Sequence, residues 1–342
     1  MTRRKALAGL APLVGAGAAA KLAGVPLTAS AAQRPTADRQ DARGAAAGAH
    51  HAGFKAGQTV DHKRNGFDPR ELLRDFDWGT TKRLPNGKVL REWELVSGEQ
   101  EIEVAPGVKY AAWSYNGRVP GPTLRCREGE QVRITFRNGS AHPHTIHFHG
   151  LHAATADGVP GLGAGLIPPG GSTVYEFPAK PFGLHLYHCH TAPLAPHIAK
   201  GLYGAFLIDP KKGRPEADEM VMVMNGFDTN FDRANEIYAA NAIGFAYMAR
   251  PVVVQSKQLV RVYLVNILEY DLVNSFHLHG NLFEYFPTGT SSTPSEFTDT
   301  VMLCQGQRGI LEWRFTEPGM FMFHAHQSEF TELGWQGFFD VR

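Results

Sequence analysis

Residues 132–138 read VRITFRN, and residues 260–266 read VRVYLVN. In both runs polar and apolar side chains alternate with a period of two, which predicts a β-strand with one buried face. Each run ends in Asn, and each is followed by a related tail, TIHFHG at 145–150 and NSFHLHG at 274–280. The sequence therefore predicts a β unit that occurs twice.

The similarity between the two units continues further along the chain. Residues 183–190 read GLHLYHCH and residues 319–326 read GMFMFHAH, about 130 residues apart like the other paired features. Short strands separated by many of the 37 Gly and 22 Pro residues favour an all-β sandwich or barrel in each unit. We expect one domain over 88–212 and a second over 213–342, joined at the breaker-rich segment 210–215 (PKKGRP).

The N-terminal region has the features of an export signal. Residues 1–31 combine the charged start TRRK, a short apolar stretch and an Ala-Ser-Ala site, which predicts a signal peptide of the twin-arginine type. The apolar stretch is too short to span a bilayer. We expect an exported protein, extracellular, cell-wall-associated or periplasmic. Residues 32–87 are expected to form a flexible N-terminal segment, because their first part is rich in Ala, Gly, Arg, Gln and His without a period.

Composition excludes several classes of protein. The 342 residues carry 34 Lys and Arg against 33 Asp and Glu, so no basic field exists to bind a nucleic acid. Three cysteines cannot form a disulfide framework. Cys126 and Cys304 could pair after export, although free buried thiols are the simpler expectation. Met220, Met222 and Met224 are spaced two apart, as on the core face of a strand, with a copper-binding cluster as the alternative.

Histidine is unusually abundant and is not scattered. Sixteen His in 342 residues would give roughly 0.7 His-x-His pairs by chance, yet five such pairs occur. Four of the five pairs occupy corresponding places in the two units. Residues i and i+2 of a strand point to the same face, and many imidazoles buried together need a cation. The pattern therefore predicts a metal centre to which both units contribute.

Cys189 indicates which metal the protein binds. It lies between two of the paired histidines, with His144 before the first pair and His197 in the following Pro-rich loop. Two imidazoles and one thiolate form the equatorial ligand set of a blue-copper site. The second unit has Asn274 and Ala325 at the places of His144 and Cys189, and its loop is shorter. All three ligands are lost together there, so we expect the blue-copper site in the first unit only.

With these motifs the sequence resembles the two-domain multicopper oxidases, small laccase-like proteins built from cupredoxin-like Greek-key β-barrel or sandwich domains. The resemblance covers about residues 89–342 and implies four coppers per chain. It implies type 1 copper on His144, Cys189 and His197, with Leu202 as a non-coordinating residue at the axial position. The type 2 copper would be bound by His147 and His277. The type 3 pair would be bound by the six remaining paired histidines, His149, His188, His190, His279, His324 and His326.

The resemblance also implies an activity. The protein would oxidise phenolic or aromatic amine donors one electron at a time and reduce O2 to water at the trinuclear cluster. Asp157 matches an acidic residue that delivers protons in relatives, and Glu329 is a second candidate. Ordinary surface carboxylates are the alternative for both residues. His142, His152 and His185 lack counterparts in the second unit and are expected not to bind metal.

Assembly and function leave alternatives that the sequence alone keeps open. By analogy with relatives we expect a homotrimer with trinuclear sites at the subunit interfaces. Other partners would be O2 and a small-molecule electron donor, with neither nucleic acid nor a membrane span. A copper-containing nitrite reductase is the first alternative function, and a non-enzymatic copper or electron-transfer protein is the second.

Overall fold

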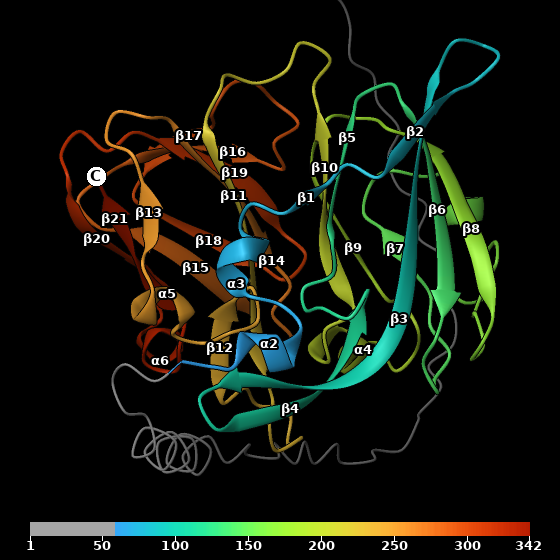
Figure 1. The fold of residues 1–342 in the computed structure, drawn as a ribbon, viewed down its shortest axis with the longest axis horizontal. Helices are drawn as coiled ribbons and strands as arrows, with labels where there is room; N and C mark the ends of the chain where they lie inside the picture. Colours follow the sequence, from blue (N-terminus) through green and yellow to red (C-terminus); the bar gives the residue numbers. More distant parts are fainter. Residues whose placement is uncertain (1–58) are drawn as a thin grey trace, which may run out of the picture. The chain divides into compact units, whose positions relative to one another are not determined.

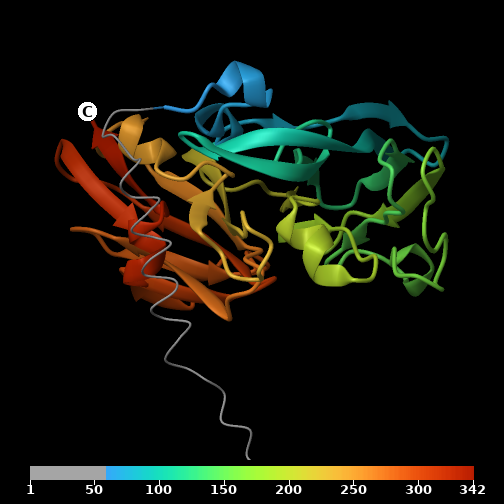
Figure 2. The same cartoon turned by 90° about the horizontal axis from the view of Figure 1, so that it is seen from below.

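The structure is a computed structural model that describes residues 59–342. The predicted signal peptide and the first part of the expected flexible segment lie outside the described residues. Most of the regular secondary structure is β-strand, with a few helices of at most six residues. The strands of residues 76–209 and those of residues 218–341 form separate sheets, coloured cyan to yellow and yellow to red in Figures 1 and 2. The expected all-β fold is confirmed.

The first half consists of two five-stranded sheets. One sheet contains, in spatial order, β1 (Phe76–Asp77), β5 (Thr123–Arg127), β10 (Tyr203–Asp209), β9 (Gly183–His188) and β7 (His147–Phe148). The other sheet contains β2 (Thr80–Arg83), β3 (Val89–Ala105), β6 (Gln131–Asn138) and β8 (Ser172–Pro178), with β4 (Val108–Tyr115) paired to β3.

The second half contains a six-stranded and a five-stranded sheet. The six-stranded sheet contains β12 (Ile237–Ala240), β11 (Asp218–Phe227), β14 (Val260–Asn266), β19 (Arg308–Trp313), β16 (Phe283–Pro287) and β17 (Glu296–Thr298). The five-stranded sheet contains β13 (Val252–Val254), β21 (Gln336–Val341), β20 (Gly319–His324), β15 (Val273–Leu278) and β18 (Thr300–Cys304).

The pairing of strands repeats between the halves. β7 pairs antiparallel with β9, and β15 pairs antiparallel with β20. The register is also equivalent, because His147 lies opposite His188 and His277 lies opposite His324. On the other sheet of each half, the parallel pair β3–β6 corresponds to the parallel pair β11–β14. The histidine pairs thus occupy the same two neighbouring strands in both halves.

The two runs used for the strand prediction differ in burial. β6 alternates between buried and more exposed residues as expected, whereas all seven residues of β14 are buried. The reason is that β14 packs on both faces. Val262 and Leu264 belong to the core of the second half, whereas Tyr263 and Val265 pack in a cluster that also contains Leu184, Leu186 and other residues of the first half.

The strand β11 has the same two-sided environment. Met220, Met222 and Met224 are fully buried in the core of the second half. Val221 and Val223, which alternate with them, lie in the cluster shared with the first half. The expected core role of the three methionines is confirmed, and their alternation with valines places β11 between two apolar layers.

The described part of the segment 32–87, for which we expected flexibility, contains regular secondary structure. From residue 59 on it forms α2 (His62–Asn65), α3 (Pro69–Leu72), β1 and β2. Asp61 and Asp68 accept hydrogen bonds from main-chain N–H groups at the starts of the two helices. Phe67, Leu72 and Leu73 are buried, and burial of these apolar side chains holds the segment on the sheets.

The remaining helices are short and lie in connections. They are η1 (Ala154–Ala156), α4 (Leu194–Ala199), α5 (Ala246–Ala249) and α6 (Ser328–Glu332). Within the described part of the chain, no helix has the length and apolar character needed to cross a bilayer. Cys126 is a buried free thiol as expected, but Cys304 is exposed at the end of β18, so the expectation that both thiols are buried is wrong for Cys304.

Candidate metal centre

Three side chains from separate segments converge inside the first half. His144 lies in the loop after β6, Cys189 directly follows β9, and His197 lies in α4. Cys189 Sγ is 3.2 Å from His197 Nδ1 and 3.7 Å from His144 Nδ1, and the two Nδ1 atoms are 3.1 Å apart. All three side chains are buried. The structure therefore brings together two nitrogen donors and one sulfur donor that the sequence grouped.

These separations suit a single small ion. An ion that lies about 2.0–2.3 Å from three donors in one plane holds those donors about 3.5 Å apart. The ring orientations also fit, because His144 Nε2 is 2.8 Å from the Ser140 hydroxyl, which leaves its Nδ1 directed at the sulfur. Burial raises the pKa of the Cys189 thiol, so the thiolate needs a cation beside it. This donor set fits copper.

Electrostatics keeps the two imidazoles of this group neutral. Burial and the neighbouring His197 lower the pKa of His144 to about 3. Burial and His142 lower the pKa of His197 to about 4. A neutral imidazole has a free lone pair, which is the form that binds a metal ion.

The first pair of His-x-His motifs lies at one end of the β7–β9 pair. His149 Nε2 and His188 Nε2 are 2.9 Å apart, and the donor atoms of His147, His149 and His188 all lie within 4.8 Å of one another. His190 lies beside them, its ring centroid 5.4 Å from that of His147. Burial and neighbouring histidines lower the pKa of His149 to about 3. We call these four residues the first half-set.

The second half repeats this arrangement on β15 and β20. His279 Nε2 and His324 Nε2 are 2.9 Å apart, and the donor atoms of His277, His279 and His324 lie within 4.8 Å of one another. The ring centroid of His326 is 5.2 Å from that of His277. We call these four residues the second half-set. Its members are more exposed than those of the first half-set.

Ring orientation supports metal binding by both half-sets. His147 Nδ1 lies 2.9 Å from the main-chain oxygen of Asp157, and His188 Nδ1 lies 2.8 Å from that of Cys189. In the second half-set, His277 Nδ1 lies 3.1 Å from the main-chain oxygen of Asp299, and His324 Nδ1 lies 2.5 Å from that of Ala325. An Nδ1–H held by an oxygen fixes the tautomer and leaves Nε2 as the donor to a metal. The residues thus fit a histidine-bound metal cluster.

The two half-sets do not meet within one chain. Among residues 59–342, the ring contacts and the groups of converging donor atoms involve either the first half-set or the second, and never both. Each half-set by itself offers four imidazoles at one sheet end. A cluster that uses all eight imidazoles therefore needs the first half-set of one chain and the second half-set of another.

The two proposed acidic residues have different surroundings. Asp157 Oδ1 lies 2.9 Å from His147 Nδ1 and 3.5 Å from His152 Nε2, so its carboxylate belongs to the environment of the first half-set. Glu329 lies in the first turn of α6, three residues after His326, with an exposed side chain. Asp157 is therefore in direct contact with a ring of the first half-set.

Of the three histidines expected not to bind metal, His142 and His185 belong to no group of converging donor atoms among the described residues, whereas His152 forms one with His147 and Asp157. His185 is buried with its two ring nitrogens 3.1 and 3.0 Å from the carbonyl oxygens of His149 and Pro181. His142 is exposed, and its ring centroid is 4.9 Å from that of Trp113. His152 shares Asp157 with His147.

Sequence reasoning missed two groups around the histidines. Thr300 Oγ1 lies 2.8 Å from His277 Nδ1, and Asp299 contacts the same ring through its main chain. Asp299 follows His277 by 22 residues, whereas Asp157 follows His147 by 10, so the repeat gave no equivalent spacing. The Trp113 ring contacts both His144 and His197, with centroid distances of 5.1 and 4.9 Å. Trp113 lies on β4, and no spacing pattern links it to these residues.

The second half has no counterpart of the Cys189 group. Asn274 is buried, with its Oδ1 accepting a hydrogen bond from Ser275 N at 2.8 Å. Ala325 packs with Trp335 in the apolar core. A buried amide and an apolar methyl group thus occupy the places of His144 and Cys189 in the second half.

Comparisons with known proteins agree with this arrangement. Residues 97–213 and residues 215–342 each match a multicopper oxidase family. A crystal structure of a multicopper oxidase is 61% identical, with a TM-score of 0.82, over 83% of this chain and 100% of that one. The multicopper oxidase mgLAC is 27% identical, with a TM-score of 0.66, over 74% of this chain and 86% of that one.

Nitrite reductases are also among the relatives. The copper-containing nitrite reductase of Neisseria meningitidis serogroup A is 29% identical over 248 residues, which are 67% of this chain and 63% of that protein. The chain thus spans about three fifths of the length of the curated nitrite reductases that it matches. Both halves have the cupredoxin-type fold, and the chain belongs to the multicopper oxidase family.

Proposed function

We propose that this protein is a laccase-like oxidase that takes single electrons from phenolic or aromatic amine donors and reduces O2 to water. The observation that carries the proposal is the presence of eight imidazoles in two equivalent half-sets beside one His–Cys–His group. Four copper ions bound by these residues would supply the one-electron oxidation and the four-electron reduction. The two cupredoxin-like domains would extend over 88–212 and 213–342.

Each residue has a role in this proposal. His144, Cys189 and His197 hold type 1 copper. The main chain of Leu202 lies beside Cys189, because the Cys189 N–H donates a hydrogen bond to the carbonyl oxygen of Leu202 at 2.9 Å. Cys189 is bonded directly to His188 and His190, which gives a covalent connection from the sulfur to the first half-set. His147 and His277 hold type 2 copper. The type 3 pair is held by His149, His188, His190, His279, His324 and His326.

The same geometry supports proposals on proton supply and assembly. Asp157 exchanges protons near the first half-set through its contact with His147, and Glu329 is a second, weaker candidate. A homotrimer joins the first half-set of one chain to the second half-set of the next, because the half-sets do not meet within a chain. We also propose export of the protein by the twin-arginine route.

Nitrite reduction is the second candidate function, favoured by the 29% identical nitrite reductases. A single nitrite-reducing copper site needs fewer imidazoles than two complete half-sets provide. The test is to load the purified protein with copper and to measure metal content, O2 uptake with a phenolic donor, and nitric oxide formation from nitrite. Four coppers per chain with O2 uptake are expected. Two coppers per chain with nitric oxide as the product would contradict the oxidase proposal.

A further inference from the structure

A cavity of about 350 Å³ lies beside the segment that joins the two halves. One wall is this connecting segment, residues 210–217, which leads from β10 to β11. The other wall comes from β5 and β14, with Trp78 at one side. None of the residues that line the cavity is a histidine or a cysteine, so the cavity includes no residue of the half-sets or of the Cys189 group.

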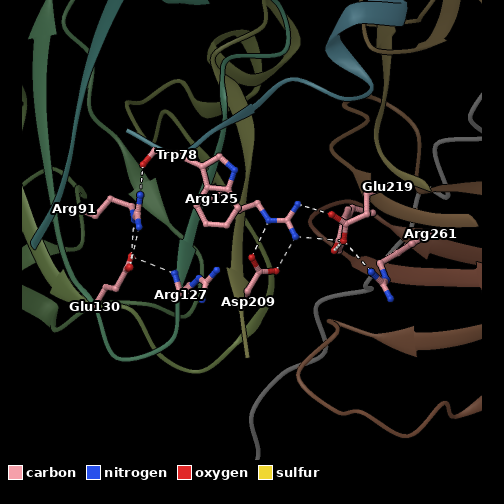
Figure 3. Close-up of polar contacts among 9 residues, drawn as sticks. Trp78, Arg91, Arg125, Arg127, Glu130, Asp209, Glu219 and Arg261 are labelled. Atoms are coloured by element: carbon pink, nitrogen blue, oxygen red, sulfur yellow. Dashed lines mark hydrogen bonds and ion pairs between the residues drawn. The ribbon is translucent and has the colours of Figure 1, made fainter. Parts of the chain in front are cut away.

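The floor of the cavity is a network of matched charges. Arg125 donates to both carboxylate oxygens of Asp209, at 2.8 and 3.0 Å, and to Glu219 at 2.6 Å. Glu219 also accepts from Arg261 at 2.8 Å. Figure 3 shows Arg125 of the first half and Arg261 of the second on opposite sides of Glu219. Arg261 has a further carboxylate partner in Glu312, so the floor cations are already neutralised.

The rim of the cavity carries cations without this compensation. Arg127, Lys211, Lys212 and Arg214 form no ion pair with any carboxylate of residues 59–342. The only acidic residue of the connecting segment is Glu216, which is exposed. The nearby Glu130 is already paired with Arg91, as Figure 3 shows. Four rim cations therefore face one rim carboxylate.

Arg214 is the clearest case of an unmatched cation. Its Nη2 donates to the carbonyl oxygen of Gly289 at 2.6 Å, and its guanidinium lies over the Phe182 ring. Its Nε is buried without a hydrogen-bond partner. This half-buried guanidinium lines the cavity without a salt bridge to any carboxylate of the described residues, and a bound anion would provide that contact.

Lys211 extends the cationic rim toward the first half. A Cβ atom added at Gly129 would stand 3.5 Å from Lys211 Cε, so the Lys211 side chain lies over the turn between β5 and β6. Arg127 is the last residue of β5, immediately before this turn. The rim cations thus come from both walls of the cavity and can approach one ligand together.

We propose that this cavity binds a small polyvalent oxyanion of the phosphate class. Arginine forks and lysine ammonium groups are the side chains that recognise phosphate oxygens, and the volume accommodates one or two phosphate groups. The anion bridges the connecting segment and β5, so it stabilises the junction of the two halves. The proposal does not depend on the copper sites or on the proposed oxidase activity.

The test is isothermal titration of the copper-loaded protein with orthophosphate and with pyrophosphate at constant ionic strength, with thermal unfolding as a second readout. Saturable binding and a higher unfolding temperature are expected, and the arm with the tighter binding identifies whether one phosphate group or two occupy the cavity. The double variant K211A/K212A should weaken binding about tenfold or more, because each lost contact is worth a sizeable factor in affinity.

Arg214→Gln tests the unmatched guanidinium separately and should weaken binding in the same direction. Lys88→Ala is the matched control, because Lys88 is an exposed lysine that does not line the cavity. The Lys88→Ala variant should bind phosphate with the same affinity as the unaltered chain. Because this variant keeps the copper sites, it also shows how much phosphate binds to copper. The proposal would be overturned by binding heats that do not saturate or by an equal effect of chloride at the same ionic strength. Unchanged phosphate affinity in K211A/K212A would also overturn it.

Discussion

Cys189 is the only residue that both completes the buried His–Cys–His group and is bonded to two histidines of the first half-set. Cys189→Ser keeps the size of the side chain but replaces the soft sulfur donor by a hydroxyl. We expect loss of the intense visible absorption of a copper–thiolate site and one copper fewer per chain. O2 uptake should fall by roughly a hundredfold or more, because the electron can no longer pass through the sulfur.

The matched control for this substitution is Cys126→Ser. Cys126 is likewise a buried free thiol of the first half, but it belongs to no group of converging donor atoms in the described part of the chain. Its substitution should lower stability and leave the visible spectrum unchanged. Equal spectra for Cys189→Ser and the unaltered protein would show that the sulfur is not a ligand.

Leu202 offers a second test at the level of one side chain. It is fully buried, and its N–H donates to the carbonyl oxygen of His197 at 3.3 Å. Leucine cannot coordinate a metal, whereas methionine is a weak axial ligand of blue-copper sites. Leu202→Met should therefore lower the reduction potential of the type 1 copper, measured by redox titration of the visible band. Leu202→Ile, which also lacks a donor, should leave the potential near its original value.

Residue spacing revealed the converging donors but not their surroundings. Four His-x-His pairs and Cys189 stand out because strand periodicity places alternate side chains on one face. Asp299, Thr300 and Trp113 could not be found in this way, because they reach the histidines through loops or from another strand. Contacts that depend on loop length and on packing between sheets leave no periodic signal in one sequence.

At the scale of elements, β11 and β14 contribute the charged residues that connect the halves. Burial raises the pKa of Glu219, but hydrogen bonds from Arg125 and Tyr263 and the charge of Arg125, with a further hydrogen bond from Arg261, outweigh burial and hold that pKa below its usual value. A carboxyl group whose pKa is lower in the folded state adds stability above the unfolded pKa and loses it as the pH falls through the folded pKa.

Glu219→Gln should therefore lower the free energy of unfolding by about 2 kcal/mol at pH 7, since it removes a charged acceptor from two buried arginines. The difference from the unaltered protein should shrink at acidic pH, as the pH falls below the ordinary Glu pKa of about 4.3 and through the lower folded-state pKa, where the carboxyl group becomes protonated. Denaturant unfolding at both pH values measures this. Glu216→Gln, on the exposed connecting segment, is the control and should change little at either pH.

The short helices α2 and α3 were not predicted from the sequence. β6 was predicted by its alternation, whereas α2 and α3 have four residues each, too few for a helical period to be recognised. Their stability comes from Asp caps and from burial of Phe67 and Leu72, which are tertiary features. The alternation predicted that β14 is a strand with one buried face. Its second face is also buried, because it packs against the first half, and a single run of residues carries no signal for that contact.

At the scale of the whole molecule, the separation of the half-sets leads to a test of assembly. One variant, His149→Ala with His188→Ala, breaks the first half-set, and a second, His279→Ala with His324→Ala, breaks the second half-set. Each variant alone should lack O2 uptake. When both are expressed together, a ring of three chains pairs an intact first half-set with an intact second half-set at one interface of every mixed trimer.

Random mixing of equal amounts makes three quarters of the trimers mixed, so about one quarter of the clusters should be complete and the same share of O2 uptake should return. The chain that supplies the intact first half-set also carries its own Cys189, so the connection from the sulfur to the cluster is preserved. If the cluster formed within one chain, every chain would keep one broken half-set. Mixing would then restore nothing, because no complete set of eight imidazoles could arise.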